Sequence, residues 1–271
     1  MLHYLRAILI GLVQGLTEFL PVSSSGHLVI AERLLNVEMP GLTFEIFLHF
    51  GTLISVIWVF RQRLFSLVKS FAALFTRGEW ARFAAEGDRW FGLLLVIASV
   101  PTAIIAFILK DYVGQAFQNP GFVGAALLFT GALLWVADIL PGGKKDIHKT
   151  SVWDALLIGT FQGLAIFPGI SRSGSTISGA LYRGLDKETA AEFSFLLSVP
   201  AVLGAALLEL VDLLRNPGGG QDWLFYLLGV TAAAAAGIIA IRFFLKLLLK
   251  NKLRYFSVYC WLVGILVLIL L

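Results

Sequence analysis

Two matching stretches of sequence, 148 residues apart, decide how this chain folds. The first reads Gln14-Gly-Leu-Thr-Glu-Phe-Leu-Pro-Val-Ser-Ser-Ser-Gly-His27, and the second reads Gln162-Gly-Leu-Ala-Ile-Phe-Pro-Gly-Ile-Ser-Arg-Ser-Gly174. The residues that recur at this spacing are Gln14, Gly15, Leu16, Phe19, Ser23, Ser25 and Gly26. Each stretch ends an apolar run in Pro, Ser and Gly, and Pro and Gly break helices. The pattern therefore predicts two similar helix–break–helix hairpins.

Both hairpins are predicted to be re-entrant, which means that each returns to the side of the membrane from which it enters. Their inward arms are expected at 7–22 and 155–170, and their outward arms at roughly 27–36 and 175–184. Such arms are short for a full crossing, which takes about 20 residues. Broken backbone at membrane depth is tolerated only where protein or a wet cavity satisfies it. We therefore expect the two breaks near the midplane, inside the protein.

The rest of the composition is that of an integral membrane protein. Of the 271 residues, 58% are hydrophobic and 14% are charged, and the mean hydropathy is +0.87. A soluble domain carries about 25% charged residues. The single cysteine, Cys260, excludes a disulfide scaffold. We predict an all-α polytopic fold, a single membrane domain over 1–271, with six transmembrane helices at about 42–60, 90–109, 121–140, 189–211, 223–246 and 255–271.

This order predicts an inverted repeat, because each hairpin precedes three crossings and three crossings change sides. The halves are expected at about 4–140 and 152–271, with the functional site where the broken helices meet. Sixteen of the 21 Lys and Arg residues fall on one side of this topology. The positive-inside rule makes that side cytoplasmic. The net charge of +4 then reflects the excess of Lys and Arg in the cytoplasmic loops, and nucleic-acid binding is not expected.

Ionisable residues placed in the membrane interior mark the candidate site, because burying them in lipid costs about 2.5–3.5 kcal/mol each on insertion scales. Gln14 and Glu18 stand four apart and share one helix face. Arg172 follows a break, where its guanidinium and a helix N-terminus can bind phosphate oxygens. His27 can move protons or attack phosphorus. The group predicts a phosphate or diphosphate site at the two breaks.

The predicted site consists of catalytic and substrate-binding candidates. The candidate catalytic residues are Glu18, Ser24, His27 and Arg172, and Glu18 is also the candidate metal ligand. The candidate substrate-binding residues are Gln14, Ser23, Ser25, Gly26, Ser171, Arg172, Ser173, Gly174 and Thr176. Glu45 and His49, also four apart, are weaker candidates. A phosphate site at membrane depth favours an amphiphilic substrate, whose head binds at the breaks while its tail stays in lipid.

Both stretches closely resemble the two motifs of the bacitracin-resistance family of bacterial undecaprenyl-diphosphatases. The resemblance extends over essentially the whole chain, including Ala191-Glu-Phe-Ser-Phe-Leu-Leu-Ser-Val-Pro200. It implies hydrolysis of undecaprenyl diphosphate to undecaprenyl phosphate and inorganic phosphate, which recycles the lipid carrier for peptidoglycan synthesis. It also implies the bacterial inner membrane, an active site facing the periplasm, and a need for a divalent cation, Mg²⁺ or Ca²⁺.

The resemblance also implies residue roles. Glu18 matches a catalytic or metal-binding acid, and Arg172, helped by Ser171, Ser173 and Thr176, matches the diphosphate-binding arginine. Ser24 and His27 match nucleophile or acid/base positions, and the family pattern does not settle which of the two attacks phosphorus. Gln14 stands where many members have Glu, which removes one charge from a metal site, and Ser25 stands where some have Thr. A polyprenyl-phosphate flippase using the same site is the rival reading, and the oligomeric state, a homodimer included, stays open.

Overall fold

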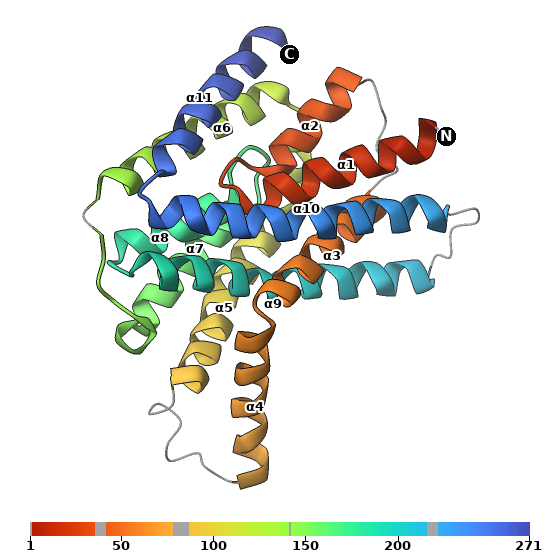
Figure 1. The fold of residues 1–271 in the computed structure, drawn as a ribbon. Coiled ribbons are helices and arrows are strands. Elements are labelled where there is room, and N and C mark those ends of the chain that lie inside the picture. Colours follow the sequence, from red (N-terminus) through yellow and green to blue (C-terminus); the bar gives the residue numbers. More distant parts are fainter. Residues whose placement is uncertain (1, 36–41, 78–86, 141, 216–221) are drawn as a thin grey trace.

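The computed structural model describes residues 2–35, 42–77, 87–140, 142–215 and 222–271, and these residues form helices without a β-strand (Figure 1). A short 3₁₀ turn covers Ile147–Lys149. The α-helices are α1 (Leu2–Phe19), α2 (Ser24–Leu35), α3 (Leu42–Val59), α4 (Arg61–Arg77), α5 (Gly87–Phe117), α6 (Pro120–Ile139), α7 (Val152–Leu164), α8 (Arg172–Tyr182), α9 (Lys187–Arg215), α10 (Trp223–Leu249) and α11 (Leu253–Leu270). The all-α polytopic class is confirmed.

Five described helices, α5, α6, α9, α10 and α11, are long and apolar enough to cross a membrane. They correspond to five of the six predicted crossings. The sixth, predicted at 42–60, corresponds to α3, which counts as a span only together with α4, across a bend of 82°. The stretch between the predicted crossings 42–60 and 90–109 begins with the helix α4, which was not predicted. This helix is amphipathic, since Leu67 is buried while Arg61 and Lys69 are exposed.

The two predicted helix–break–helix hairpins are present as α1–α2 and α7–α8, and their re-entrant course through the membrane stays a prediction. The first arm begins at Leu2, earlier than the expected residue 7. The breaks meet each other in the interior. The Gly169 backbone N–H donates to Ser23 Oγ at 3.1 Å, and Ser173 Oγ donates to the Leu20 carbonyl at 3.3 Å. The predicted convergence of the breaks is therefore confirmed.

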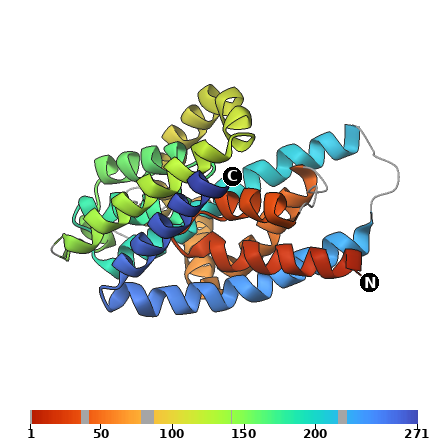
Figure 2. The ribbon, with the colours of Figure 1, turned by 90° about the horizontal axis from the view of Figure 1, so that it is seen from above.

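Helices from the two halves of the chain pack against each other. The first arm α1 lies along α10, as Figures 1 and 2 both show, and the other inward arm, α7, lies along α5. Glycine permits both approaches: a Cβ on Gly15 would lie 2.4 Å from the Ala233 carbonyl oxygen, and one on Gly159 would lie 1.9 Å from that of Ala98. Small residues let membrane helices approach this closely. The two-fold relation between the halves and the repeat bounds of 4–140 and 152–271 stay predictions.

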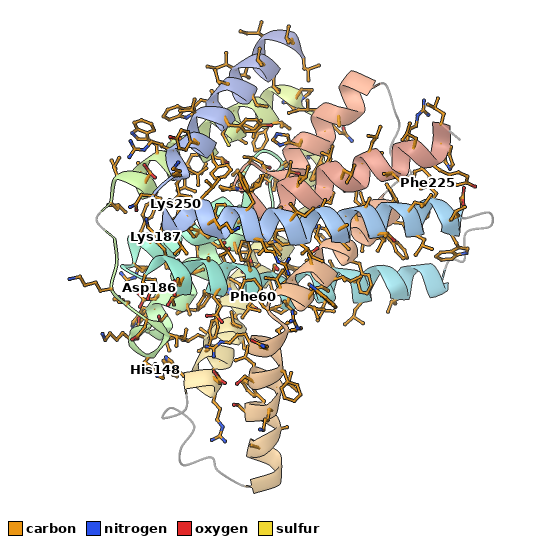
Figure 3. The ribbon with its side chains drawn as sticks, in the orientation of Figure 1. Phe60, His148, Asp186, Lys187, Phe225 and Lys250 are labelled. Carbon is orange, nitrogen blue, oxygen red and sulfur yellow. The ribbon has the colours of Figure 1, made fainter. Side chains whose placement is uncertain are left out.

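One end of the molecule gathers several charged loops. Figure 3 shows Asp186, Lys187 and Lys250 together on one side, with Phe225 at the opposite end. These charged residues lie at the junction of α8 with α9 and at the junction of α10 with α11. Nearby, Asp138 accepts from Arg254 Nε at 2.7 Å and from the Leu253 backbone at 3.0 Å, which fixes the start of α11 on the end of α6.

Candidate functional site

Equivalent serine caps build the two breaks. Ser23 Oγ accepts from the Gly26 backbone N–H at 3.3 Å, and Ser171 Oγ accepts from Gly174 at 3.1 Å. A serine that precedes a helix by one residue commonly caps its free N–H groups in this way. Ser23 adopts a positive φ of 68°, which is uncommon for a residue other than glycine. These caps make the next residue, Ser24 or Arg172, the first residue of α2 or α8.

Glu18, one residue from the end of α1, is the centre of the site. Its side chain is 5% exposed, and Ser24 Oγ donates to Oε2 at 2.6 Å. Gln14 Nε2 donates to the same oxygen at 3.0 Å, and Arg172 Nη2 donates to Oε1. A buried carboxylate is tolerated when it is paired and hydrogen-bonded in this way. The structure thus brings four predicted site residues into direct contact.

A histidine that we had ranked low, His49 of α3, joins this group. Its Nδ1 lies 3.1 Å from Gln14 Nε2 and 3.6 Å from Glu18 Oε2. The spacing Glu45–His49 had marked the residue as a weak candidate. The contact with Gln14 depends on how α3 packs against α1, and no local pattern reveals that packing.

A cavity of about 270 Å³ opens beside these groups. Its polar lining is Glu18, Ser23, Ser24, Ser25, His49, Thr102, Gln162, Ser171, Arg172 and Ser198. Its apolar lining is Ile46, Phe117, Ala165, Ile166, Ile170, Ala201, Val202 and Ala205. Within the described chain, the buried atoms Arg172 Nη1, Gln14 Oε1 and Gln162 Oε1 have no hydrogen-bond partner. A site of this kind suits a ligand that has both a polar and an apolar part.

His27 lies elsewhere. Its Nδ1 is 2.8 Å from the Ser23 carbonyl oxygen, so Nδ1 carries the proton, and its Nε2 accepts from the Tyr259 hydroxyl at 2.7 Å. The His27 and Tyr259 rings stack with centroids 5.6 Å apart. His27 is not part of the cavity lining given above. Both ring nitrogens are therefore occupied, Nδ1 by the Ser23 carbonyl and Nε2 by Tyr259 of α11.

Other predicted residues support the backbone of the breaks and do not line the cavity. Ser173 is buried and bonds to Leu20, and Gly26 packs with its Cα region against Gly169. Thr176 Oγ1 donates to the Arg172 carbonyl and lies 2.5 Å from Ser194 Oγ. These contacts hold the start of α8 in place.

Sequence reasoning left Thr102 and Ser198 out of the site, and it did not connect Tyr259 with His27. Thr102 follows Pro101, and Ser198 lies two residues before Pro200, each inside an apolar helix. Thr102 Oγ1 donates to the Gly159 carbonyl at 2.8 Å and accepts from Gln162 Nε2 at 3.3 Å. A single polar residue beside a proline in an apolar span is the signal that would have found the first two.

The described residues contain no cluster of three His, Cys, Asp or Glu side chains that could bind a metal. They do offer two hard oxygen donors on one helix face, the Glu18 carboxylate and the unpartnered Gln14 Oε1. Mg²⁺ commonly takes one or two protein ligands together with substrate phosphates and water. The donor set therefore fits a divalent cation that arrives with a phosphorylated ligand.

Known proteins match the chain along nearly its entire length. A family model described as "Bacitracin resistance protein BacA" matches residues 7–266. The undecaprenyl-diphosphatase of Alkaliphilus metalliredigens is 45% identical over 268 residues, 97% of this chain and 97% of that protein. The undecaprenyl-diphosphatase of Carboxydothermus hydrogenoformans is 42% identical over 267 residues, 98% of this chain and 96% of the relative. The undecaprenyl-diphosphatase of Halothermothrix orenii is 40% identical over 265 residues, 98% of this chain and 97% of that protein.

Proposed function

The chain belongs to the bacitracin resistance protein BacA family, and from this premise we propose that it hydrolyses undecaprenyl diphosphate to undecaprenyl phosphate and inorganic phosphate. It is a phosphatase, and its product is the lipid carrier that peptidoglycan synthesis uses again. The three relatives described above are all named diphosphatases, which supports hydrolysis over transport of the lipid.

The arrangement of Ser24, Glu18 and Arg172 carries this proposal. A hydroxyl, a carboxylate and a guanidinium converge at one edge of a cavity that continues into apolar walls. Phosphoryl transfer needs a positioned nucleophile, a proton acceptor and positive charge near the phosphoryl oxygens. The three side chains supply these in order.

The diphosphate head binds between the two breaks. Arg172 uses Nη2 for Glu18, which leaves its buried Nη1 as a donor for a phosphate oxygen. The helices α2 and α8 both begin at this point, and the N-terminus of a helix attracts and binds anions. The prenyl tail leaves along the apolar lining contributed by Ile46, Ala201 and Val202. Recognition is thus divided between a polar head site and an apolar path.

Ser24 is the nucleophile in this account. Its Oγ forms a bond to the terminal phosphorus while the bond from that phosphorus to the bridging oxygen breaks, and the Oγ proton passes to Glu18 over the 2.6 Å hydrogen bond. Undecaprenyl phosphate leaves. Water then attacks the phosphoserine: Glu18 returns its proton to the departing Oγ and takes one from water. Releasing that proton to solvent resets the site.

The position of His27 supports Ser24 over the imidazole. Attack by His27 would require Nε2 to leave the Tyr259 hydroxyl and turn toward a cavity that it does not line. We assign His27 to holding the first break through its bond to the Ser23 carbonyl. Two serines noted in the family resemblance have supporting roles in this proposal. Ser171 caps α8, and Ser25 lines the cavity.

A divalent cation, Mg²⁺ or Ca²⁺, would be held by Glu18 and Gln14 Oε1 together with diphosphate oxygens. Bound there, it would neutralise charge on the diphosphate. The protein is a multi-pass membrane protein. We place it in the bacterial inner membrane with the site facing the periplasm, on the strength of the basic loops; assembly as a homodimer stays a prediction.

Phosphate release from undecaprenyl diphosphate by the purified protein in detergent tests the function. The wild type is expected to release one phosphate per lipid, and Arg172→Ala is expected to lose at least about a hundredfold in kcat/KM, because a charge-assisted contact and the Glu18 counterion both disappear. The matched control is Arg61→Ala, since Arg61 is exposed and bonds only locally to the Trp58 carbonyl. Hydrolysis by Arg172→Ala at the wild-type rate would refute the assignment.

A further inference from the structure

The mechanism above gives no role to His49, a polar residue of the cavity lining. His49 lines the cavity on the side of α3, and its side chain is 35% exposed there. Of the two histidines near the breaks, it is this one, and not His27, that reaches the space assigned to the diphosphate. Its role rests on the proposed function, since the ligand in question is the substrate of that reaction.

The neighbouring amide determines which nitrogen of His49 carries the proton. Gln14 Nε2 lies 3.0 Å from Glu18 Oε2, and an ionised carboxylate, whose other oxygen Oε1 pairs with Arg172, can only accept. If the amide oxygen and nitrogen of Gln14 exchanged places, Oε1 would face Glu18 Oε2, and two hydrogen-bond acceptors would lie in contact without a proton between them. The amide therefore presents its two hydrogens to Glu18 and to His49 Nδ1, which lies 3.1 Å away. Nδ1 accepts this bond and carries no proton.

The opposite nitrogen is then a donor. A neutral imidazole with an unprotonated Nδ1 has its hydrogen on Nε2. Within the described residues His49 Nε2 has no hydrogen-bond partner, and the polar side-chain contacts of the ring are with Gln14 and Glu18, both through Nδ1. Arg172 lines the same cavity, and its buried Nη1 is a second donor without a partner among the described residues. Two unused N–H groups at one polar cavity are what an anionic, acceptor-rich head group would satisfy.

We propose that His49 is a substrate-binding residue, which donates a hydrogen bond from Nε2–H to the diphosphate while Gln14 holds its Nδ1 as an acceptor. Arg172 and His49 then hold the head group from different helices, α8 and α3.

Steady-state phosphate release tests this role with three variants. His49→Ala removes the donor, and we expect KM to rise at least tenfold while kcat changes less than about threefold, since a bond to a charged group contributes on this scale. His49→Gln places an amide N–H near the position of Nε2–H and should restore KM to within about threefold of wild type. The matched control, His3→Gln, changes an exposed histidine that pairs only with Asp222 at the surface and with neighbouring aromatic rings, and should leave both constants unchanged.

A binding measurement separates this proposal from the hydrolysis itself. A prenyl methylene-diphosphonate, which cannot be hydrolysed at its P–C–P link, should bind His49→Ala at least tenfold more weakly than wild type or His49→Gln. If wild type releases no phosphate but this ranking holds, the reaction is wrong and the His49 contact is right. Equal analogue affinity for wild type and His49→Ala overturns the contact. So does a His49→Gln variant as impaired as His49→Ala, with both folded by thermal unfolding in detergent.

Discussion

Ser24 and Arg172 stand at the same place in two equivalent helix starts, 148 residues apart, and each donates a hydrogen bond to a different oxygen of the Glu18 carboxylate. Ser23 and Ser171, the preceding residues, cap the two helices with the same i to i+3 bond. The same serine-capped helix start, present twice, therefore places a hydroxyl from one half of the chain and a guanidinium from the other half at Glu18. The two helix starts offer different groups to Glu18 because Ser24 in the first corresponds to Arg172 in the second.

Trapping a phosphoenzyme should identify the nucleophile. With substrate labelled in its terminal phosphate, acid quenching is expected to leave label on the protein as phosphoserine, which survives acid and is lost in alkali. Ser24→Ala should carry no label and should lose at least about a hundredfold in kcat. Ser178→Ala is the matched control, since Ser178 Oγ is buried without a partner and outside the cavity. Acid-labile label that disappears in His27→Ala would assign the attack to His27.

Removing divalent cations should stop turnover. We expect EDTA to abolish phosphate release and Mg²⁺ or Ca²⁺ to restore it, because the diphosphate brings more charge than Arg172 alone can neutralise. Gln14→Glu would add a second carboxylate four residues from Glu18, and the cation concentration for half-maximal rate should fall. Full activity after EDTA treatment would show that hydrolysis needs no divalent cation. An unchanged cation concentration for half-maximal rate in Gln14→Glu would show that Gln14 does not bind the cation.

Asp154 should make the second hairpin sensitive to acid. Its buried carboxylate, in the first turn of α7 and outside the spanning helices, accepts from Arg183 Nε at 2.5 Å, from Lys145 Nζ at 3.2 Å and from Ser151. Burial opposes the charged form, but the hydrogen bonds from Ser151, Arg183 and Lys145 outweigh it, and the pKa of Asp154 is lowered. The carboxylate therefore stabilises the fold above its ordinary pKa of 3.8, and this contribution is lost as pH falls through the lowered value.

Asp154→Asn tests this expectation. At neutral pH the variant should unfold at a lower temperature than wild type, by an amount that corresponds to about 1–3 kcal/mol, since a cap and a partly exposed ion pair are lost. The difference should shrink as the pH approaches the lowered pKa. Thermal unfolding in detergent at a series of pH values measures it, and a pH-independent difference would contradict the electrostatic explanation.

Close packing of α1 on α10 should tolerate no added methyl group at Gly15. A Cβ there would lie 2.4 Å from the Ala233 carbonyl oxygen, so the helices must separate. We expect Gly15→Ala to cost about 1–3 kcal/mol of stability and to lower activity, because Gln14 and Glu18 move with α1. Gly114→Ala is the control, since its Cβ would meet nothing within 4 Å. Equal unfolding temperatures for the two variants would show that the contact is not tight.

The parts of this structure that could be predicted from sequence are those marked by a repeat or by a long apolar run. The shared Gln14 and Gln162 stretches located both breaks, and the meeting of Glu18 with Arg172 followed from placing the breaks at one depth. The bend between α3 and α4 was missed: Arg61 and Arg63 mark the end of the apolar run, but they do not show that the chain turns by 82° there and continues as a helix. The pairing of His27 with Tyr259 was missed for a related reason: it joins residues 232 positions apart through the packing of α11.

The structure of the protein with a bound prenyl methylene-diphosphonate tests the central claim most directly. The account predicts that the terminal phosphonate lies within hydrogen-bonding distance of Arg172 Nη1 and Ser24 Oγ, with the prenyl chain passing Ile46 and Val202. A head group that binds away from both breaks, or that leaves Ser24 too far from the terminal phosphorus to attack it, would contradict the account.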